Sequence, residues 1–137
     1  MTTDNCELKL NNLSINISGK EIVKSVSLPF YKNKVTSIMG PSGCGKTTLI
    51  RTINRLNEAV EFEISGQIFF DNEDLLSMNP IVVRRRIGMV FQRPNPFPSM
   101  SIFDNVISGY MLNGIKLDKN EKETIVEECL TKVGLYE

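Results

Sequence analysis

The chain has 137 residues, enough for one domain with a hydrophobic core, and its 16 Lys and Arg residues balance 16 Asp and Glu residues. This balance gives no overall electrostatic reason to expect a nucleic acid or an anionic membrane as partner, and the absence of histidine excludes a Ser-His-Asp triad and an H-E-x-x-H zinc site. Three widely spaced cysteines without a C-x-x-C pair indicate reduced thiols, and no apolar run approaches the roughly 20 residues of a membrane helix.

The first third of the chain is predicted to form antiparallel strands. In "CELKLNNLSINIS" apolar residues alternate at Leu8 and Leu10 and then, in a second phase, from Leu13 to Ile17. The two asparagines between the phases predict a turn or a bulge. The stretch "SVSLPF" (25–30) also alternates, and it carries Pro29 near its end, where a missing backbone donor is tolerated.

The middle of the chain is predicted to alternate between strands and helices. "KVTSIM" (34–39) has the composition of a buried strand, and apolar residues at helical spacing predict a helix over 46–57. "GQIFFD" (66–71) predicts a further strand, and "NPIVVRRRIG" (79–88) predicts a short helix that leads into a strand at "IGMVF" (87–91). We interpret the three arginines at 84–86 as a solvated helix end rather than a nucleic-acid patch.

The last third begins with a loop and continues as two helices. Residues 92–100, "QRPNPFPSM", contain three prolines and predict a stiff, exposed loop. The first amphipathic helix follows Ser101, a suitable N-cap, and the second lies between "DKNE" and Gly134. The order of elements predicts an α/β fold with an antiparallel portion.

One motif carries chemistry. "GPSGCGKT" (40–47) fits the phosphate-loop (P-loop) pattern G-x-x-x-x-G-K-[ST], between a predicted strand and a predicted helix. Its glycines let the backbone turn with N–H groups directed inward, and the start of the helix adds free amides and a positive dipole end. Lys46 can reach the β- and γ-phosphates of a nucleotide, and the Thr47 hydroxyl can coordinate Mg²⁺.

The sequence therefore predicts nucleotide binding, although a P-loop alone does not define the reaction. The predicted nucleotide-binding residues of this loop are Gly40, Pro41, Ser42, Gly43, Cys44, Gly45, Lys46, Thr47 and Thr48.

Beyond the P-loop, four stretches together resemble the N-terminal part of an ATP-binding cassette (ABC) ATPase. They are "LNNLSINISGKEIVKSVSLPF", "KVTSIMGPSGCGKTTLIRTINRLNE", "SGQIFFDNEDL" and "RRRIGMVFQRPNPFPSMSIFDNV". Within them, "FQRPNPFPSMSIFDNV" and "TLIRTINRLNE" resemble the ATPase subunits of bacterial phosphate importers. The resemblance covers nearly the whole chain.

The resemblance implies a P-loop NTPase core with an antiparallel β-subdomain (residues 1–91), a Q-loop (92–100) and the start of a helical subdomain (101–137). It also implies ATP and Mg²⁺ as cofactors, a homodimer of the full-length protein, a membrane permease as partner and no nucleic acid. Because "MTTDNCELKL" lacks the order of a secretory signal, we expect the protein at the cytoplasmic face of the membrane, peripherally bound.

Two further site residues follow from the resemblance. The family's loop glutamine falls on Gln92, which would contact Mg²⁺ and the attacking water, so Lys46 and Gln92 are the predicted catalytic residues. Residues 92–100 would face the permease, with Phe97 as an apolar tip or, alternatively, folded back on the core. The family stacks an aromatic residue on adenine, and here that position aligns with Ile17, which can cover one face of a base but loses the ring stacking.

The sequence also departs from the family. It contains no four-apolars-Asp-Glu motif, no "LSGGQ"-like signature and no switch histidine; Asp71, in "QIFFDN", is interpreted as a turn residue after a strand. We therefore expect an incomplete ABC ATPase, a fragment of a longer protein, that binds nucleotide better than it hydrolyses it. Two alternatives stay open: a non-catalytic, nucleotide-binding interaction module, and a soluble ABC ATPase that does not serve transport.

Overall fold

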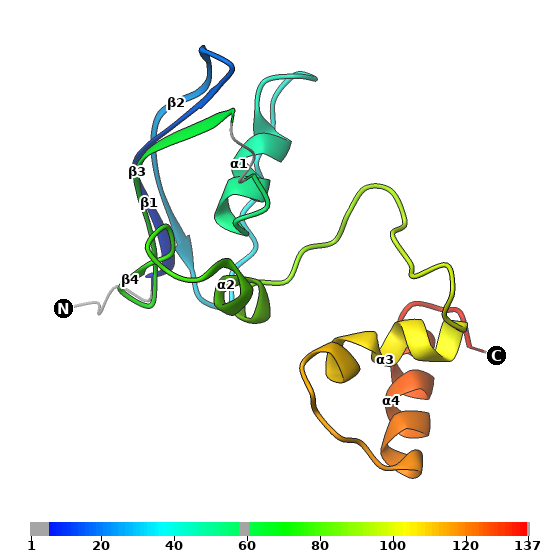
Figure 1. Ribbon diagram of the computed structural model, residues 1–137. Coiled ribbons are helices and arrows are strands. Elements are labelled where there is room, and N and C mark those ends of the chain that lie inside the picture. The colour runs from blue at the N-terminus through cyan, green and yellow to red at the C-terminus, as the bar shows by residue number, and fades with distance from the viewer. Residues whose placement is uncertain (1–5, 58–60, 137) are drawn as a thin grey trace. The chain divides into compact units, whose positions relative to one another are not determined.

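The computed structural model describes residues 6–57 and 61–136, and the chain divides into two compact units, residues 1–89 and 90–137. Figure 1 shows a sheet with helices α1 and α2 in the first unit and helices α3 and α4 in the second. None of the helices in the described residues combines the length and the apolar character that crossing a membrane requires.

The sheet of the first unit is antiparallel, as predicted. Strands β1 (Cys6–Ile17), β2 (Lys20–Tyr31), β3 (Phe62–Phe70) and β4 (Glu73–Asp74) lie in the order β2-β1-β3-β4. Strand β2, which contains Pro29, is at an edge of the sheet, where proline is tolerated. Asp71 follows the end of β3 with a φ of +49°, which confirms it as a turn residue.

The bulge predicted in the first strand is present. Asn12 has a φ of +45°, and the register of β1 against both neighbours shifts at this point. The extra residue returns Leu13 and Ile15 to the face that Leu8 and Leu10 occupy, so one strand can bury both phases of its apolar pattern. Gly66 of β3 lies opposite, with a φ of +91°, and a Cβ at this position would be 2.4 Å from the Asn12 carbonyl oxygen.

The core lies between the sheet and the helices of the first unit. Helices α1 (Lys46–Ile53) and α2 (Pro80–Arg86) contribute Leu49, Ile53 and Val83 to it. The sheet side and the segment after β4 contribute Leu8, Leu10, Leu13, Ile15, Val23, Ile68 and Leu75. Figure 1 shows both helices on the same side of the sheet. The helix predicted over 46–57 is shorter than expected, since α1 ends at Ile53.

The three arginines are all exposed, which confirms the interpretation as a solvated helix end, but two of them also make contacts within the first unit. Arg86 forms ion pairs with Glu73 and with Asp71, and its guanidinium lies 4.7 Å from the centre of the Phe70 ring. Hydrogen bonding to Glu73 is the main cause that raises the pKa of Arg86 above its ordinary value. Arg84 donates to the Arg55 carbonyl oxygen. These contacts attach the end of α2 to the β3–β4 turn and to the end of α1.

Two predicted strands, 34–39 and 87–91, are wrong: both segments are irregular. Val35, Met39 and Val90 are 97%, 89% and 97% exposed, so these apolar side chains are not packed. A strand requires a neighbour for its backbone N–H and C=O groups, and within the described residues no strand lies beside either segment. Both segments are apolar, as a buried strand would be, but an apolar composition alone does not produce a strand.

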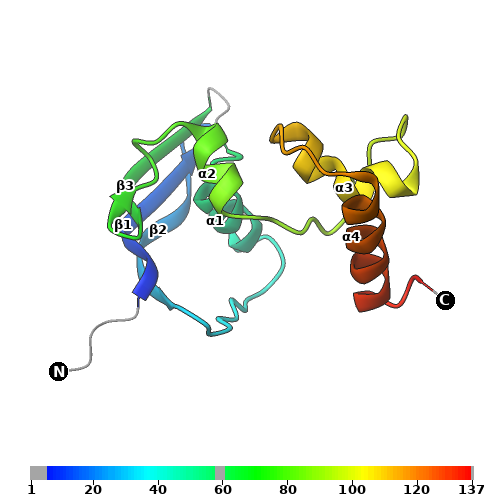
Figure 2. The same ribbon diagram turned by 90° about the horizontal axis from the view of Figure 1, so that it is seen from below.

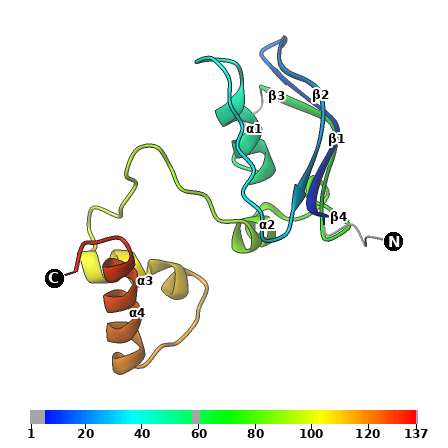
Figure 3. The same cartoon turned by 180° about the vertical axis from the view of Figure 1, so that it is seen from behind.

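The second unit consists of the two predicted helices and the loop before them. Helix α3 (Ile102–Leu112) begins at Ser101, whose hydroxyl accepts from the Asp104 N–H at 3.0 Å, which confirms this N-cap. Helix α4 (Lys119–Lys132) begins with a capping box between Asp118 and Glu121. The two helices lie side by side (Figures 2 and 3), and Ile107 and Val126 are buried between them.

Candidate functional site

The P-loop is built on glycines that the local geometry requires. Gly43 and Gly45 have φ values of +80° and +96°, a region that side chains rarely adopt. Gly45 also lies against β2, because an added Cβ would be 3.1 Å from both the carbonyl oxygen and the Cγ2 atom of Ile22. The loop can therefore turn tightly at the edge of the sheet only with glycine at this position.

Helix α1 starts directly after this turn. Gly45 is its N-cap and supplies no side-chain acceptor, and the first turn of the helix contains no acidic residue. The first amides of the helix are thus not satisfied by a side-chain cap, and they carry the positive end of the helix dipole. A phosphate is the kind of group that such a helix start binds.

Lys46 lies across the loop. Its ammonium donates to the carbonyl oxygens of Gly40 and Pro41, both at 2.7 Å, and it is 3.6 Å from the Cys44 sulfur. The two carbonyls are neutral acceptors, so a charged phosphate oxygen would be a stronger partner for the same ammonium. The fit of the loop to a nucleotide rests on these features together: glycines with positive φ, a helix start without a side-chain cap and a lysine held over the loop.

A small hollow lies between β2 and the P-loop. Its volume is about 250 Å³. The residues that line it are Ile22, Val23, Lys24, Val26, Ile38, Met39, Cys44, Gly45, Lys46 and Leu49. Most of these side chains are apolar, so the hollow suits an apolar group better than a phosphate.

The other predicted site residues lie at different places. Ile17 is at the end of β1, half-buried and packed against the core, and Figures 1 and 3 show the tip of the β1–β2 hairpin at the same end of the first unit as the P-loop. Thr47 is exposed in the first turn of α1. Gln92 is exposed near the start of the second unit. The roles of all three residues stay predictions.

Polar residues after α1, which the sequence analysis did not single out, hold this helix in place. The buried side chain of Asn57 donates to the Thr48 carbonyl at 2.9 Å and to the Thr52 hydroxyl at 3.0 Å. Asn54 donates to the Ile87 carbonyl. The sign of this role in the sequence is that polar residues predominate in "INRLNE". An amphipathic helix would instead continue its apolar face there.

Arg55 makes a further set of bonds at the same place. One of its guanidinium nitrogens donates to the carbonyls of Leu75, Leu76 and Met78 at 2.6–2.9 Å. A planar guanidinium can satisfy several backbone acceptors at once, which a shorter polar side chain cannot. The end of the P-loop helix is therefore attached to the segment between β4 and α2.

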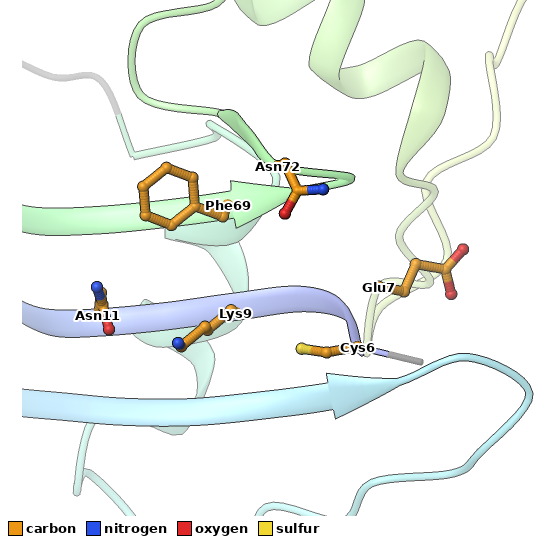
Figure 4. Close-up of a pocket in the computed structure, with 6 residues that line it drawn as sticks. All are labelled: Cys6, Glu7, Lys9, Asn11, Phe69 and Asn72. Carbon is orange, nitrogen blue, oxygen red and sulfur yellow. The ribbon is translucent and has the colours of Figure 1, made fainter. Parts of the chain in front are cut away.

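A second hollow, of about 360 Å³, lies on the other face of the sheet, since its residues alternate with those that face the core. Figure 4 shows Lys9 and Asn11 of β1 beside Phe69 of β3, while the Glu7 carboxylate points away from them. These groups do not converge on a common point, so they form no evident ligand site.

Comparisons with known proteins agree with this geometry. A family model described as ABC transporter matches residues 23–137. The chain belongs to the ABC transporter family. The phosphate import ATP-binding protein PstB of Tropheryma whipplei (strain Twist) is 40% identical over 95% of this chain and 51% of its own length, and PstB of Rubrobacter xylanophilus is 48% identical over 84% and 41%.

A solved structure also resembles this member of the ABC transporter family. It is an ATP-binding cassette, solved as a dimer in a post-hydrolysis state bound to ADP and Pi, with a TM-score of 0.80 and 26% identity over 95% of this chain and 58% of that one. The family and the fold class predicted from the sequence are confirmed. The chain spans about half the length of the curated relatives it matches.

Proposed function

We propose that the protein carrying this sequence is the ATP-binding subunit of an ABC importer that couples Mg-ATP binding and hydrolysis to the uptake of inorganic phosphate. The observation that carries the proposal is the P-loop, in which Gly45 lies against β2 and Lys46 reaches across the loop at the start of α1. The relatives support phosphate as the transported ion, since they are phosphate import proteins.

The loop from Gly40 to Thr48 would bind the phosphates of ATP through its backbone amides. Lys46 would exchange its two carbonyl partners for the β- and γ-phosphate oxygens. Thr47 and Gln92 offer oxygen ligands for Mg²⁺, which, when bound, neutralises part of the phosphate charge. Ile17 would cover one face of the base.

The 137-residue chain is expected to bind ATP without appreciable turnover. Its sequence contains neither a second carboxylate motif nor an "LSGGQ"-like signature. Hydrolysis requires a positioned water and stabilisation of the charge that develops in the transition state. The P-loop alone provides only part of the second requirement.

The partner would be a permease that the loop 92–100 contacts from the cytoplasmic side of the membrane, so the protein would be peripheral. A homodimer of the full-length protein is supported by the dimeric state of the similar ATP-binding cassette. A nucleic-acid partner is not favoured, because Arg84 and Arg86 are engaged in contacts within the first unit.

The test is calorimetric titration of Mg-ATP into the chain and into Lys46→Ala. Loss of a charge-assisted hydrogen bond of about 1.5–3 kcal/mol predicts binding weaker by roughly 10- to 150-fold. Lys32→Ala, a loss of the same charge in the exposed turn after β2, should leave the affinity unchanged. Equal affinities for all three proteins would contradict a P-loop site.

Phosphate release from the full-length protein separates the remaining alternatives. Turnover that a membrane permease stimulates supports the importer. Binding without turnover would favour the non-catalytic interaction module, and turnover that no permease affects would favour the soluble ABC ATPase.

A further inference from the structure

The tip of the proline-rich loop is held by one side chain of α3. Asn105, in the first turns of that helix, accepts from the Phe97 N–H at 2.7 Å through its Oδ1 atom and donates to the Phe97 carbonyl at 3.1 Å through its Nδ2 atom. The side-chain amide thus pairs with both backbone groups of one residue, as a neighbouring strand would. The backbone of Phe97 is thereby fixed relative to α3.

The same amide group closes the rest of the loop. The Nδ2 atom of Asn105 also lies 3.2 Å from the Met100 carbonyl and 3.0 Å from the Ser101 carbonyl. The Met100 N–H in turn donates to the Phe97 carbonyl at 3.1 Å. Residues 97–101 and the start of α3 consequently form one hydrogen-bonded body.

The loop itself has few backbone N–H groups with which to form such hydrogen bonds. Phe97 lies between Pro96 and Pro98, and prolines have no N–H group. A loop of this composition cannot form its own ladder of backbone bonds, although the prolines restrict its φ angles. Asn105 supplies an acceptor for the Phe97 N–H and the side-chain donors that take the place of the missing proline N–H groups.

The side chains that this arrangement presents are apolar and accessible. Phe97 is 43% exposed and Ile102, at the start of α3, is 75% exposed. Both line a hollow of about 390 Å³ together with Pro96 and Val106. Fixing such a surface before binding reduces the entropy that association would otherwise lose.

We propose that Asn105 is a positioning residue that pre-orders the loop tip and presents Phe97 to the permease. This inference rests on the proposed function, because the loop 92–100 is assigned to the permease there. Asn105 acts through Phe97 and is not itself required to contact the permease, ATP or Mg²⁺.

The first test measures amide hydrogen exchange of Phe97 by NMR in the chain and in Asn105→Ala. We expect exchange at Phe97 to become at least about tenfold faster because its acceptor is removed, while the amides of α3 keep their rates, since alanine favours a helix more than asparagine does. Asn105→Asp, which keeps an acceptor but loses the donors, should give an intermediate rate. The control is Asn113→Ala, at the end of the same helix, whose side chain donates to the Gly109 carbonyl and not to the loop in the part of the chain that the structure describes.

Unchanged exchange at Phe97 would overturn the proposal. Faster exchange along the whole of α3 would do so as well, because Asn105 would then only maintain the helix. These readouts do not depend on ATP or on a permease.

The second test uses the full-length protein and its permease reconstituted in liposomes. Asn105→Ala and Phe97→Ala should both weaken association with the permease severalfold and leave the affinity for Mg-ATP within about twofold of the parent, since neither residue belongs to the P-loop. If only Phe97→Ala weakens association, the positioning role is wrong. If the parent protein does not associate with the permease, the proposed function fails, and the presentation of Phe97 to a permease fails with it; the exchange data show which step was at fault.

Discussion

Replacing Gly66 by alanine should open the sheet at the bulge of β1. The added Cβ would lie 2.4 Å from the Asn12 carbonyl oxygen and 2.6 Å from the Asn11 carbonyl oxygen, closer than any ordinary contact. Both obstructing atoms belong to backbone, so no side-chain rotation can relieve them. Overpacking of about 1–3 kcal/mol adds to about 1–3 kcal/mol for a non-glycine residue in this φ region, which gives a loss of about 2–6 kcal/mol in the free energy of unfolding.

The assay is urea unfolding followed by far-UV circular dichroism, with Gly19→Ala as the matched control. Gly19 belongs to the same sheet unit and also has a positive φ, +77°, but an added Cβ there would meet nothing within 4 Å. The control should therefore show only the conformational cost, about 1–2 kcal/mol. If Gly66→Ala destabilises no more than Gly19→Ala, the close approach of β3 to the bulge is not what makes glycine necessary.

Three further substitutions test other contacts of the fold. Asn57→Ala removes a buried amide from the P-loop helix and should lower the free energy of unfolding by about 1–3 kcal/mol, measured by urea unfolding; an unchanged midpoint would show that the amide is dispensable. Arg86→Ala removes the ion pair with Glu73 and should lower the melting temperature at low salt but much less in about 1 M NaCl, where charges are screened; an equal loss at both salt concentrations would contradict an electrostatic role. Asp118→Ala breaks the capping box with Glu121 and should cost about 1 kcal/mol, seen as lost helix signal in circular dichroism, whereas Asp118→Asn should retain most of it.

The bulge of β1 and the N-cap of α3 could be predicted from sequence because their causes are local. The alternation of Leu8 and Leu10, interrupted before Leu13, requires one extra residue if a single strand is to bury both groups. Ser101 likewise caps a helix through an atom only three residues away. In both cases the residues that determine the structure are neighbours in the chain.

The segments at 34–39 and 87–91 show why the same reasoning fails elsewhere. Their apolar residues satisfy the composition of buried strands, but a strand forms only when a neighbour satisfies its backbone groups. Composition gives the preference of a segment, and the pairing partner is a property of the whole sheet. Val35 and Val90 stay exposed for this reason, although their sequences resemble those of the strands that do form.

The P-loop and the residues that hold it differ in the same way. The glycines and Lys46 are recognisable because phosphate binding requires those residue types at fixed spacing. Asn57, Arg55 and Asn105 instead donate to backbone carbonyls, which every residue possesses, so no pattern in the sequence identifies their partners. The sequence shows only that hydrogen-bond donors are missing. Around Phe97, the flanking prolines remove the N–H groups that a loop would use, and this deficit requires a side-chain amide from elsewhere in the fold. Since Asn105 satisfies that requirement from a helix rather than from the loop, the rigidity of the loop tip depends on α3 being folded, and loss of the helix should release Phe97 even when the loop sequence is unchanged.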